Sequence, residues 1–560
     1  MSVHLGAVRS HGGGNRGLEF AASDSARDQV FSGRFIRMFD LRPARSVEPE
    51  VFKAIAEAMI KDDKGAPITE PEPVDENPTI TAGYTYFGQF VDHDVTLDTT
   101  ALNAKVKDEA AVTDFRSPAL DLDCVYGRGP GDQPYLYEQR PAKAGHLRLG
   151  ARPGAADAVV GNQSDVLRLA ASTDGGPRDD FAILGDKRND ENKIVNQIHA
   201  TIIQFHNRVY DQIATGPRGS DERFAETVDI VRWHYQYVVV HDYLKRILHP
   251  KVWTRYFEKG IAKTRYYEAL GSRYSYMPLE FSVAAFRFGH SMVRPSYSLN
   301  SAIFEVGAGP RIPVFSGSEE LFANLNGFPG TLLPDWGADW HFFLPGLTAS
   351  PGTPADFVVP QPSYRIDALL VDPLAQLPEF KDQGIKANLA YRNLVRGQMN
   401  GLPSGERLAR HVGLDPMNDE TLWGIGSKVF DGTIEALPIE EKAKEELGTL
   451  KAARASLRER FILGHDESLR FNTPLWYYIL REAEVFGIHG TTADGKPDPL
   501  LALGGHHLGP LGSLILAETF AGILRMDASS IAGRDFRPDP RIQDGMPKFD
   551  LAALFRFACG

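Results

Sequence analysis

The sequence predicts a mainly α-helical protein with one large domain, long loops and very little β structure. Apolar residues recur at steps of three and four over many segments, which is the period of a helix with one buried face. Strand-like alternation is scarce, and no low-complexity linker or internal repeat separates the helical segments. A length of 560 residues alone would suggest roughly three or four domains. Because nothing divides the helices, we expect a single domain over residues 35–540.

The predicted elements follow one another along the chain. Apolar residues four apart predict a short helix within 46–60, and the apolar segment 79–97 predicts a buried helix. Residues 99–180 are rich in Asp, Gly, Pro and Arg and predict loops. Further helical patterns cover residues 191–214, 223–248, 278–293, 384–399, 405–411, 439–462 and 473–487. The pattern over 191–214 is the clearest, and Asp190 before it is a suitable N-cap.

The two ends are expected to lie outside the domain. Residues 1–34 contain Gly12-Gly13-Gly14 and few large apolar side chains, so we expect a flexible or surface-draped arm. Residues 541–560 are expected to form a C-terminal extension. The first residues lack a basic stretch followed by an apolar one, so no N-terminal signal peptide is expected. The protein is therefore predicted to be cytoplasmic, or secreted by a route independent of a signal peptide.

The composition excludes several classes of protein. Lys and Arg number 61 against 73 Asp and Glu, and this net charge of −12 argues against a nucleic-acid partner. No run of roughly 18 apolar residues occurs, so no membrane span is expected. Cys124 and Cys559 are the only cysteines, which excludes a disulfide framework, a cysteine-rich zinc module and an iron–sulfur cluster. The oligomeric state is not predicted.

One motif places two carboxylates around a histidine in an apolar helix: Phe87-Gly88-Gln89-Phe90-Val91-Asp92-His93-Asp94. Buried charges are costly unless they are paired or coordinated. Gln89 and His93 are four apart and share a face, whereas Asp94 is turned about 100° away and needs another partner. The same pattern suits a helix end with a solvated Asp-His-Asp tip, so it does not decide a function alone.

Two further motifs are also ambiguous by themselves. Ser117-Pro118-Ala119-Leu120-Asp121-Leu122-Asp123 alternates oxygen donors, as a Ca²⁺ loop does when a carboxylate joins it from elsewhere. An isolated Asp-x-Asp, however, is more often a solvated turn. Gly185-Asp186-Lys187-Arg188-Asn189-Asp190-Glu191 precedes the long helix, where acidic residues suit the helix N-terminus and Arg188 suits a surface ion pair.

A second histidine motif, Phe286-Arg287-Phe288-Gly289-His290, lies in the helical segment 278–293. One interpretation of His290 is a core histidine held by hydrogen bonds. His290 also suits an axial haem ligand, because Gly289 would leave space for a flat macrocycle. Asn393 lies in Arg392-Asn393-Leu394-Val395-Arg396 of the segment 384–399.

Together and in this order, with His206-Asn207-Arg208, these motifs resemble the animal-type haem peroxidases of the peroxidase–cyclooxygenase superfamily, and among them its bacterial-type members. The resemblance covers residues 79–535 and implies a haem b cofactor and Ca²⁺. It implies that His93 is the distal histidine, with Gln89 beside it, and that Arg188 is the catalytic arginine. It further implies that His290 is the iron ligand, with Asn393 accepting a hydrogen bond from its second ring nitrogen.

The resemblance also assigns the acidic residues. Asp92 and Glu191 match two carboxylates that form ester bonds to haem methyl groups in many relatives. Asn192 stands where some relatives carry a haem-linked Met, so a third link is not expected. The implied calcium ligands are Asp94, Ser117, Ala119 through its carbonyl, Asp121 and Asp123.

The implied activity is that of a haem peroxidase with a place in the response to oxidative stress. It would reduce H₂O₂ through a ferryl compound I intermediate and oxidise iodide, bromide, thiocyanate or small aromatic donors, with chloride less favoured. His93 would serve as general base and then general acid. Arg188 would stabilise the negative charge on the departing oxygen.

The sequence leaves alternatives open. A fatty-acid dioxygenase of the same superfamily would need a radical-forming tyrosine near the haem. Arg287 stands three residues before His290, where cyclooxygenases have that tyrosine, which favours a peroxidase, while Tyr274 and Tyr276 keep the alternative open. The complete set of His93, Arg188, His290 and Asn393 argues against an inactive adhesion or matrix protein. His506-His507 has no partner spacing that would indicate a metal site.

Overall fold

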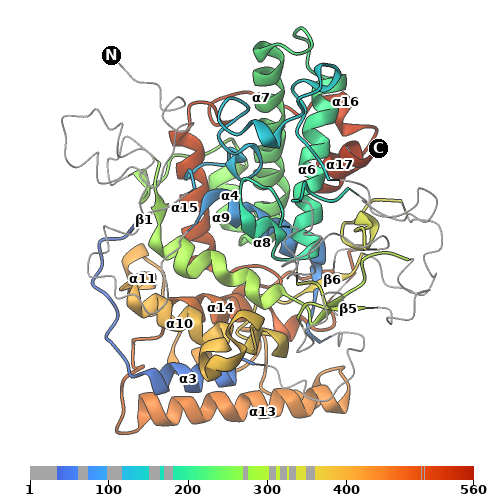
Figure 1. Cartoon of the computed structure of the whole chain (residues 1–560). Coiled ribbons are helices and arrows are strands. Elements are labelled where there is room, and N and C mark those ends of the chain that lie inside the picture. Colours follow the sequence, from blue (N-terminus) through green and yellow to red (C-terminus); the bar gives the residue numbers. More distant parts are fainter. Residues whose placement is uncertain are drawn as a thin grey trace.

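Helices form most of the described chain, and the predicted mainly helical fold class is confirmed (Figure 1). The computed structural model describes residues 35–60, 74–97, 116–150, 164–169, 181–268, 275–301, 311–315, 324–326, 336–348, 360–492, 495–496 and 498–560. The predicted arm, residues 1–34, lies outside the described residues. Within the described ranges, β structure is limited to three two-stranded pairs and isolated bridges.

The longer elements are α-helices. Their bounds are α3 Pro49–Ala58, α4 Ala82–Val95, α5 Asp123–Tyr126, α6 Lys193–Gln212, α7 Asp221–Val238, α8 Leu244–Ile247, α9 Pro250–Phe257, α10 Leu389–Met399, α11 Gly405–Val412, α12 Asp419–Leu422, α13 Glu441–Arg458, α14 Leu475–Phe486, α15 Pro510–Met526, α16 Pro540–Gln543 and α17 Leu551–Cys559. The strands are β1 Phe35–Ile36, β2 Glu76–Thr81, β3 Met277–Pro278, β4 Ser296–Tyr297, β5 Ile312–Pro313 and β6 Pro362–Tyr364.

Tighter and wider helical turns connect these elements. The 3₁₀ turns are η2 Pro134–Leu136, η3 Pro141–Lys143, η4 Lys187–Asp190, η8 Ala285–Met292, η10 Trp340–Phe342, η11 Asp372–Ala375, η12 Pro378–Ala387, η13 Ile434–Ala436 and η15 Leu501–Leu503. The π turns are η5 Val239–Tyr243, η7 Glu280–Ala284 and η14 Glu459–Leu463. The predicted helix over 278–293 is therefore a π turn followed by 3₁₀ turns, a departure from regular helix that often accompanies a functional site.

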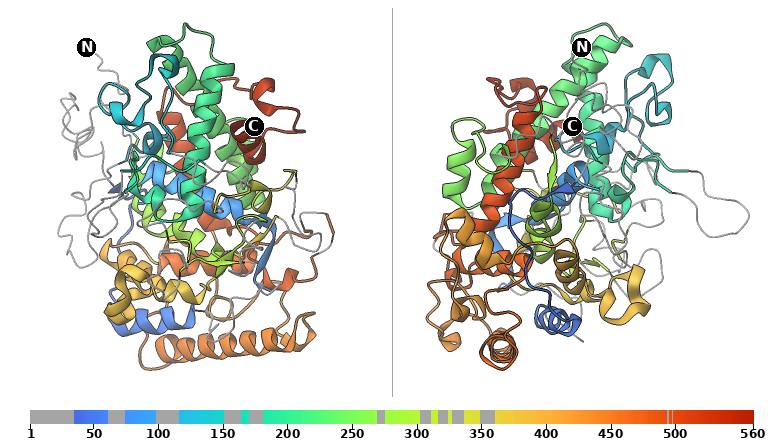
Figure 2. Two further views of the ribbon diagram at one scale, coloured as in Figure 1. Left: turned by 45° about the vertical axis from the view of Figure 1, so that its right-hand side comes forward. Right: turned by 90° about the vertical axis from the view of Figure 1, so that its left-hand side faces the viewer.

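The helices surround α4, which crosses the middle of the molecule. α6 and α7 stand side by side in the upper half, and α13 lies along the lower edge beneath α3 (Figures 1 and 2). α4 packs against α6, β6 and η8. The largest cluster of buried apolar side chains runs from Phe35 to Ala558, so one core joins the first and last described elements.

α6 shows why the long predicted helix forms. Ile194, Ile198 and Ile202 recur on one face and are at most 1% exposed. Its N-cap is Asn192, whose side chain accepts a hydrogen bond from the Ile194 amide at 2.8 Å. The predicted N-cap, Asp190, is wrong by two residues.

Asp190 is occupied elsewhere. Its carboxylate accepts hydrogen bonds from the guanidinium of Arg168 at 2.7 and 2.9 Å and from Asn196 at 2.7 Å. The tertiary partner Arg168 therefore displaces Asp190 from the capping position that the local sequence favours.

Among the described helices of eight or more residues, the sequence patterns miss three: α9, α15 and α17. α15 and α17 are buried on almost every side, so neither has the polar face that makes a helix visible in sequence. α17 lies within the segment 541–560, and it packs on α6 in the same core as the predicted domain. Even so, no helix in the described part of the chain is long and apolar enough to cross a membrane.

The start of α4 is held by main chain from distant segments. The Ala82 amide donates to the Gln361 carbonyl at 2.9 Å, and the Gly83 amide donates to the Phe343 carbonyl at 3.1 Å. A Cβ at Gly83 would lie 2.7 Å from that Phe343 oxygen, so only glycine allows the approach. These contacts satisfy amides that a helix N-terminus leaves free and fix α4 in place.

Candidate functional site

A cavity of about 420 Å³ lies between α4, η4, η8, the residues that follow β5 and the segment that leads into α10. This volume is typical of cofactor and small-molecule sites. Its wall contains six of the predicted site residues: Gln89, Asp92, His93, Arg188, Glu191 and His290. Asn393 stands behind His290. Apolar side chains supply much of the remaining wall, including Phe286, Phe288, Met292, Val293, Val314, Phe315, Leu374, Leu377 and Leu389.

α4 presents Gln89 and His93 to this cavity from one helical face, as their spacing predicts. Gly88 lies against Tyr243, and a Cβ at that position would collide with the Tyr243 hydroxyl. Glycine thus lets the helix approach the π turn η5. His93 is 3% exposed, so the helix is buried here and does not end in a solvated tip.

Both ring nitrogens of His93 have defined neighbours. Nδ1 lies 2.8 Å from Oδ1 of Asn189, and Nε2 lies 3.4 Å from Oε1 of Glu191. The amide of Asn189 continues to a second buried histidine, because its Nδ2 lies 3.0 Å from Nδ1 of His199. Burial lowers the pKa of His199 to about 3, so this imidazole is neutral. Neither Asn189 nor His199 was singled out from sequence, since the chain of contacts begins at His93, about a hundred residues before them.

Glu191 faces the cavity beside the tip of His93. Gln89 Nε2 donates a hydrogen bond to the same carboxylate oxygen. Burial raises the pKa of Glu191, but the hydrogen bond from His93, the charge of Arg188 and the bond from Gln89 together lower the pKa below its ordinary value. The group is therefore an anion in the structure.

Arg188 is oriented by a carboxylate two residues before it. Asp186 accepts hydrogen bonds from the Arg188 amide at 2.9 Å, from Nε at 3.1 Å and from Nη2 at 2.8 Å. Nη2 also donates to the carbonyls of His93, at 3.2 Å, and Thr96. Nη1 lies 4.0 Å from Asp92 Oδ2. The predicted catalytic arginine is thus tied to the helix that carries His93.

On η8, His290 is a neutral imidazole. Burial and the nearby charge of Arg287 lower its pKa to about 3, which leaves a lone pair free to bind iron. Asn393 Nδ2 lies 2.9 Å from His290 Nδ1, and Asn393 Oδ1 accepts a hydrogen bond from Arg287 Nη1 at 3.2 Å. The amide nitrogen faces the ring here, whereas the resemblance implies the oxygen. The hydrogen bond that the resemblance implies, from a protonated Nδ1 to Asn393 Oδ1, would require the Asn393 amide to be turned over.

The space beside His290 suits a flat group. A Cβ added at Gly289 would meet no heavy atom within 4 Å, and Gly289 lines the cavity. A neutral imidazole, open space next to it and the two carboxylates Asp92 and Glu191 in the same wall fit a haem.

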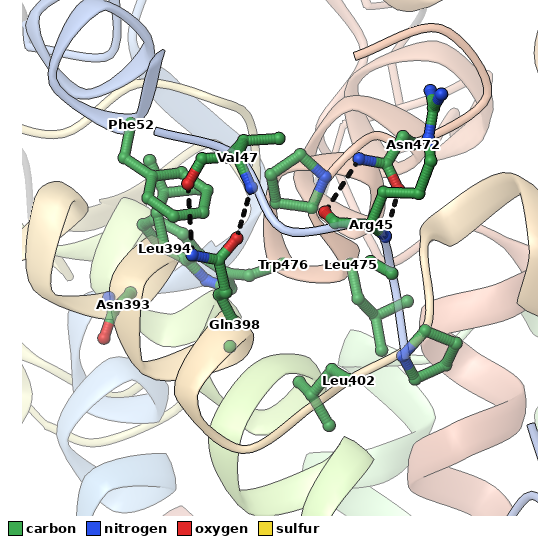
Figure 3. A pocket seen from close by; sticks show the side chains of 14 residues that line it. Arg45, Val47, Phe52, Asn393, Leu394, Gln398, Leu402, Asn472, Leu475 and Trp476 are labelled. Atoms are coloured by element: carbon green, nitrogen blue, oxygen red, sulfur yellow. Dashed lines mark hydrogen bonds between the residues drawn. The ribbon is translucent and has the colours of Figure 1, made fainter. Parts of the chain in front are cut away.

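Figure 3 shows a small, mostly apolar space behind Asn393, between α10, α14 and the segment 44–47. Two side-chain amides hold that segment in place. Val47 donates to and accepts from Gln398 at 2.7 and 3.2 Å, and Arg45 does the same with Asn472 at 2.8 and 3.0 Å. Residues 44–47 therefore brace α10, which carries Asn393.

The three predicted calcium-binding aspartates come together in a second site. Carboxylate oxygens of Asp94, Asp121 and Asp123 lie within 4.8 Å of one another, and we call these residues the carboxylate cluster. Ser117 Oγ donates to both oxygens of Asp121 at 2.9 and 2.8 Å, and the Ser117 amide donates to Asp123 at 3.2 Å. Ala119 is buried in the same loop. Within the described ranges, no other three His, Cys, Asp or Glu residues gather in this way.

Asp94 is the member of the cluster whose surroundings best suit a cation. The residue is fully buried, and neither carboxylate oxygen has a hydrogen-bond partner among the described residues. Burial, followed by the charges of Asp121 and Asp123, raises its pKa well above the ordinary value. Leu122, between the other two aspartates, adopts the left-handed conformation with φ of 59°, which is uncommon for a residue with a side chain. A buried, unpartnered carboxylate with two acidic neighbours fits an oxygen-liganded cation such as Ca²⁺.

The tyrosines near the cavity differ from those expected. Tyr86 and Tyr243 line it, although neither was singled out from sequence. Tyr276 is stacked on Tyr267, with ring centroids 4.2 Å apart, and is not part of the wall. Tyr274 lies outside the described residues.

The pair His506-His507 belongs to a buried group away from the cavity. His506 Nε2 lies 2.9 Å from Asp498 Oδ2, and the rings of His249 and His489 flank His507 at 5.3 and 4.9 Å. Burial lowers the pKa of both His506 and His507 to about 3. The described members of this group do not bring three ligand atoms together, so no metal site is indicated.

Comparisons with known proteins agree with this geometry. A model of the animal haem peroxidase family matches residues 109–421, more than half of the chain. This stretch contains Arg188, Glu191, His290 and Asn393, whereas His93 lies before it. Human thyroid peroxidase is 26% identical over 309 residues, which are 53% of this chain and 30% of that protein. The chain spans about a third of the length of the curated relatives it matches.

A solved peroxidase structure has the same fold. Peroxidase A from Dictyostelium discoideum is 15% identical with a TM-score of 0.56, over 95% of this chain and 94% of that one. A fatty acid alpha-dioxygenase from Oryza sativa shows a weaker likeness, with 13% identity and a TM-score of 0.47 over 88% of this chain and 75% of that one. Since the family match covers more than half of the sequence, the chain belongs to the animal haem peroxidase family.

Proposed function

We propose that this protein is a haem peroxidase that reduces H₂O₂ and oxidises iodide, bromide, thiocyanate or small aromatic donors. The observation that carries the proposal is a single cavity that gathers His93, Gln89 and Arg188 from α4 and η4 together with His290 from η8. Consumption of H₂O₂ would give the protein a part in the response to oxidative stress.

His93 is the residue that moves the proton. Haem b held through His290 Nε2 would supply the redox-active iron at which peroxide is reduced. The proton on His93 Nδ1 is held by Asn189 Oδ1, so Nε2 is the nitrogen that accepts a proton from one peroxide oxygen and returns it to the other.

Arg188 contributes a fixed positive charge. Its guanidinium is held by Asp186 and by two carbonyls of the segment 93–96, so it does not have to reorganise when negative charge develops on the departing oxygen. Gln89 lies in the same wall and orients Glu191.

Asp92 and Glu191 are the candidates for ester bonds to haem methyl groups. Both line the cavity, and Glu191 lies next to His93 Nε2. An ester at Glu191 would also remove the anion beside Nε2, and so leave that nitrogen free to serve as a base.

The carboxylate cluster is the proposed Ca²⁺ site, with Asp94, Asp121, Asp123, Ser117 and the Ala119 carbonyl as ligands. Asp94 directly follows His93 on α4. A cation bound to Asp94 would therefore hold the end of α4 and the position of the distal base.

A fatty-acid dioxygenase is the second candidate. Tyr86 and Tyr243 line a partly apolar cavity, as a radical-forming tyrosine would have to. Arg287, at the position three residues before His290, favours the peroxidase.

The test compares the two activities in haem-replete protein. We expect H₂O₂-dependent oxidation of bromide, thiocyanate or phenol, and no O₂ uptake with an unsaturated fatty acid alone. The absence of any H₂O₂-dependent oxidation would contradict the proposal. Fatty-acid-dependent O₂ uptake that is lost in Tyr86→Phe or Tyr243→Phe would establish the second candidate instead.

A further inference from the structure

Arg116 connects the carboxylate cluster to the loop that carries Arg188. Its Nη1 lies 3.1 Å from Asp123 Oδ1, and its Nε lies 3.4 Å from Asp186 Oδ2. Nη2 also donates to the Gly185 carbonyl at 3.3 Å. The Arg116 side chain is 11% exposed, so water screens these charges only weakly.

Asp186 is shared between two guanidinium groups. It binds Arg188 through three hydrogen bonds and faces Arg116 on its other side. Burial alone would raise the pKa of Asp186, but Arg188 most strongly, with Arg116 contributing, lowers it to about 2. The carboxylate is therefore a permanent anion between the two arginines.

The two loops are also in direct main-chain contact. A Cβ at Gly185 would collide with the Cys124 carbonyl and lie 2.9 Å from the Asp123 carbonyl. The backbone before Arg188 therefore rests on the backbone of Asp123. A shift of the segment 117–123, the proposed calcium loop, would therefore reach Asp186 both through this contact and through Arg116.

Carboxylates outnumber guanidiniums around Arg116. Asp94, Asp121, Asp123 and Asp186 stand against Arg116 and Arg188, and Arg188 also faces Asp92 at 4.0 Å. This excess of negative charge favours a bound cation such as Ca²⁺. Arg116 and the cation would both be attracted by Asp123, so each would partly neutralise the charge that attracts the other.

We propose that Arg116 is a positioning residue that ties the orientation of Arg188 to the calcium loop, an inference that rests on the proposed peroxidase function. Arg116 partly neutralises Asp123 and braces Asp186, and Asp186 orients the Arg188 guanidinium. Arg116 itself is not among the residues that line the cavity.

The test is Arg116→Gln, which removes the charge and keeps a polar side chain of similar reach. We expect the second-order rate constant with H₂O₂ to fall about tenfold while the KM for the electron donor stays unchanged, because Arg188 loses its support. We expect Ca²⁺ to bind about tenfold more tightly, because a positive charge beside Asp123 is gone. Calcium affinity is measured by calorimetry without peroxide.

Two further variants sharpen the test. Arg116→Lys restores the charge but not the planar guanidinium, which can bind two partners at once. The calcium affinity should therefore return to that of the wild type, while the peroxide reaction recovers only in part. Arg140→Gln is the matched control, because Arg140 lies on the same described segment, 116–150, but pairs with Glu138 at the surface. This control should change neither the calcium affinity nor the rate constant with H₂O₂.

The expected changes in Arg116→Gln have opposite directions, a slower reaction with H₂O₂ and tighter calcium binding. A general loss of structure would weaken both, so the two explanations can be told apart. If Arg116→Gln weakens calcium binding together with the peroxide reaction, Arg116 is merely structural and the inference is overturned. An unchanged peroxide reaction would overturn it as well. A wild-type protein that is inert towards H₂O₂ would count against the proposed function, whereas an unchanged calcium affinity in Arg116→Gln would count against the role of Arg116.

Discussion

At the scale of single residues, the cavity is organised around the two nitrogens of His93. Asn189 Oδ1 faces Nδ1 at 2.8 Å, so the second nitrogen, Nε2, is the one turned to Glu191 and the cavity. The orientation of the Asn189 amide is set in turn by His199 at 3.0 Å. His93, Asn189 and His199 are all at most 3% exposed, so water cannot replace a lost partner.

Replacement of His93 by Ala tests the role of the distal base. We expect the second-order rate constant with H₂O₂ to fall by about 100-fold to 10,000-fold, because the base that moves the proton between the oxygens is lost. Stopped-flow absorption measures this rate, and the absorption spectrum should show that haem is still bound. His465→Ala, at an exposed position, is the control and should react as the wild type does.

Asn189→Leu tests the hydrogen bond behind His93. The leucine keeps the volume but leaves Nδ1 without an acceptor, so the H₂O₂ rate constant should fall about tenfold or more. Asn189→Asp restores an acceptor and should recover the rate. Equal rates in Asn189→Leu and the wild type would show that Nδ1 needs no partner.

At the scale of elements, glycines decide how closely helices approach one another and the cavity. Gly88 lets α4 pack on Tyr243 of η5, whereas Gly289 of η8 borders open space. The same substitution should therefore have opposite consequences at the two positions.

Gly88→Ala should destabilise the protein by about 1–3 kcal/mol, since the new methyl group collides with the Tyr243 hydroxyl. Tyr243→Phe removes that hydroxyl and should recover part of the loss. Gly289→Ala should leave the stability of the haem-free protein unchanged or slightly raised, but weaken haem binding. Denaturant unfolding and haem titration measure these effects. If Gly289→Ala binds haem as tightly as the wild type, the macrocycle does not lie beside Gly289.

Buried carboxylates make a second kind of contact between elements. Glu482 of α14 accepts hydrogen bonds from the Leu511 and Gly512 amides and so caps α15, which has no side-chain cap of its own. A Cβ at Gly509 would lie 2.6 Å from the same carboxylate. The start of α15 is therefore determined by a residue about thirty positions away.

At the scale of the whole molecule, buried neutral histidines link the stability of the fold to pH. His206 of α6 is fully buried between the Tyr126 hydroxyl at 3.0 Å and the Gly145 carbonyl at 2.9 Å. Burial lowers its pKa to about 4, from an ordinary value of 6.5. Between these pH values the unfolded chain binds a proton that the folded chain does not.

The free energy of unfolding should therefore fall on acidification, with a contribution from His206 of about 1.4 kcal/mol per pH unit between pH 6.5 and 4. His206→Gln removes this titration, so its stability should depend less on pH in that window, although its stability at pH 7 is lower. Denaturant unfolding at several pH values provides the measurement. Parallel pH curves for the two proteins would contradict a neutral, buried His206.

The sequence by itself determined the helical fold class, the long helix α6 and the residues that carry the peroxidase resemblance. Amphipathic helices repeat apolar residues with a regular period, and ligand-bearing motifs keep their residue types close together. Only the tertiary structure decided the rest. α15 and α17 lack a polar face and so leave no periodic signal, and Arg168 takes Asp190 away from the cap of α6. Asn189, Tyr86, Tyr243 and Arg116 contact residues that are distant in the chain. Such pairings are set by packing and by the need to satisfy buried charges, which no local pattern of residues records.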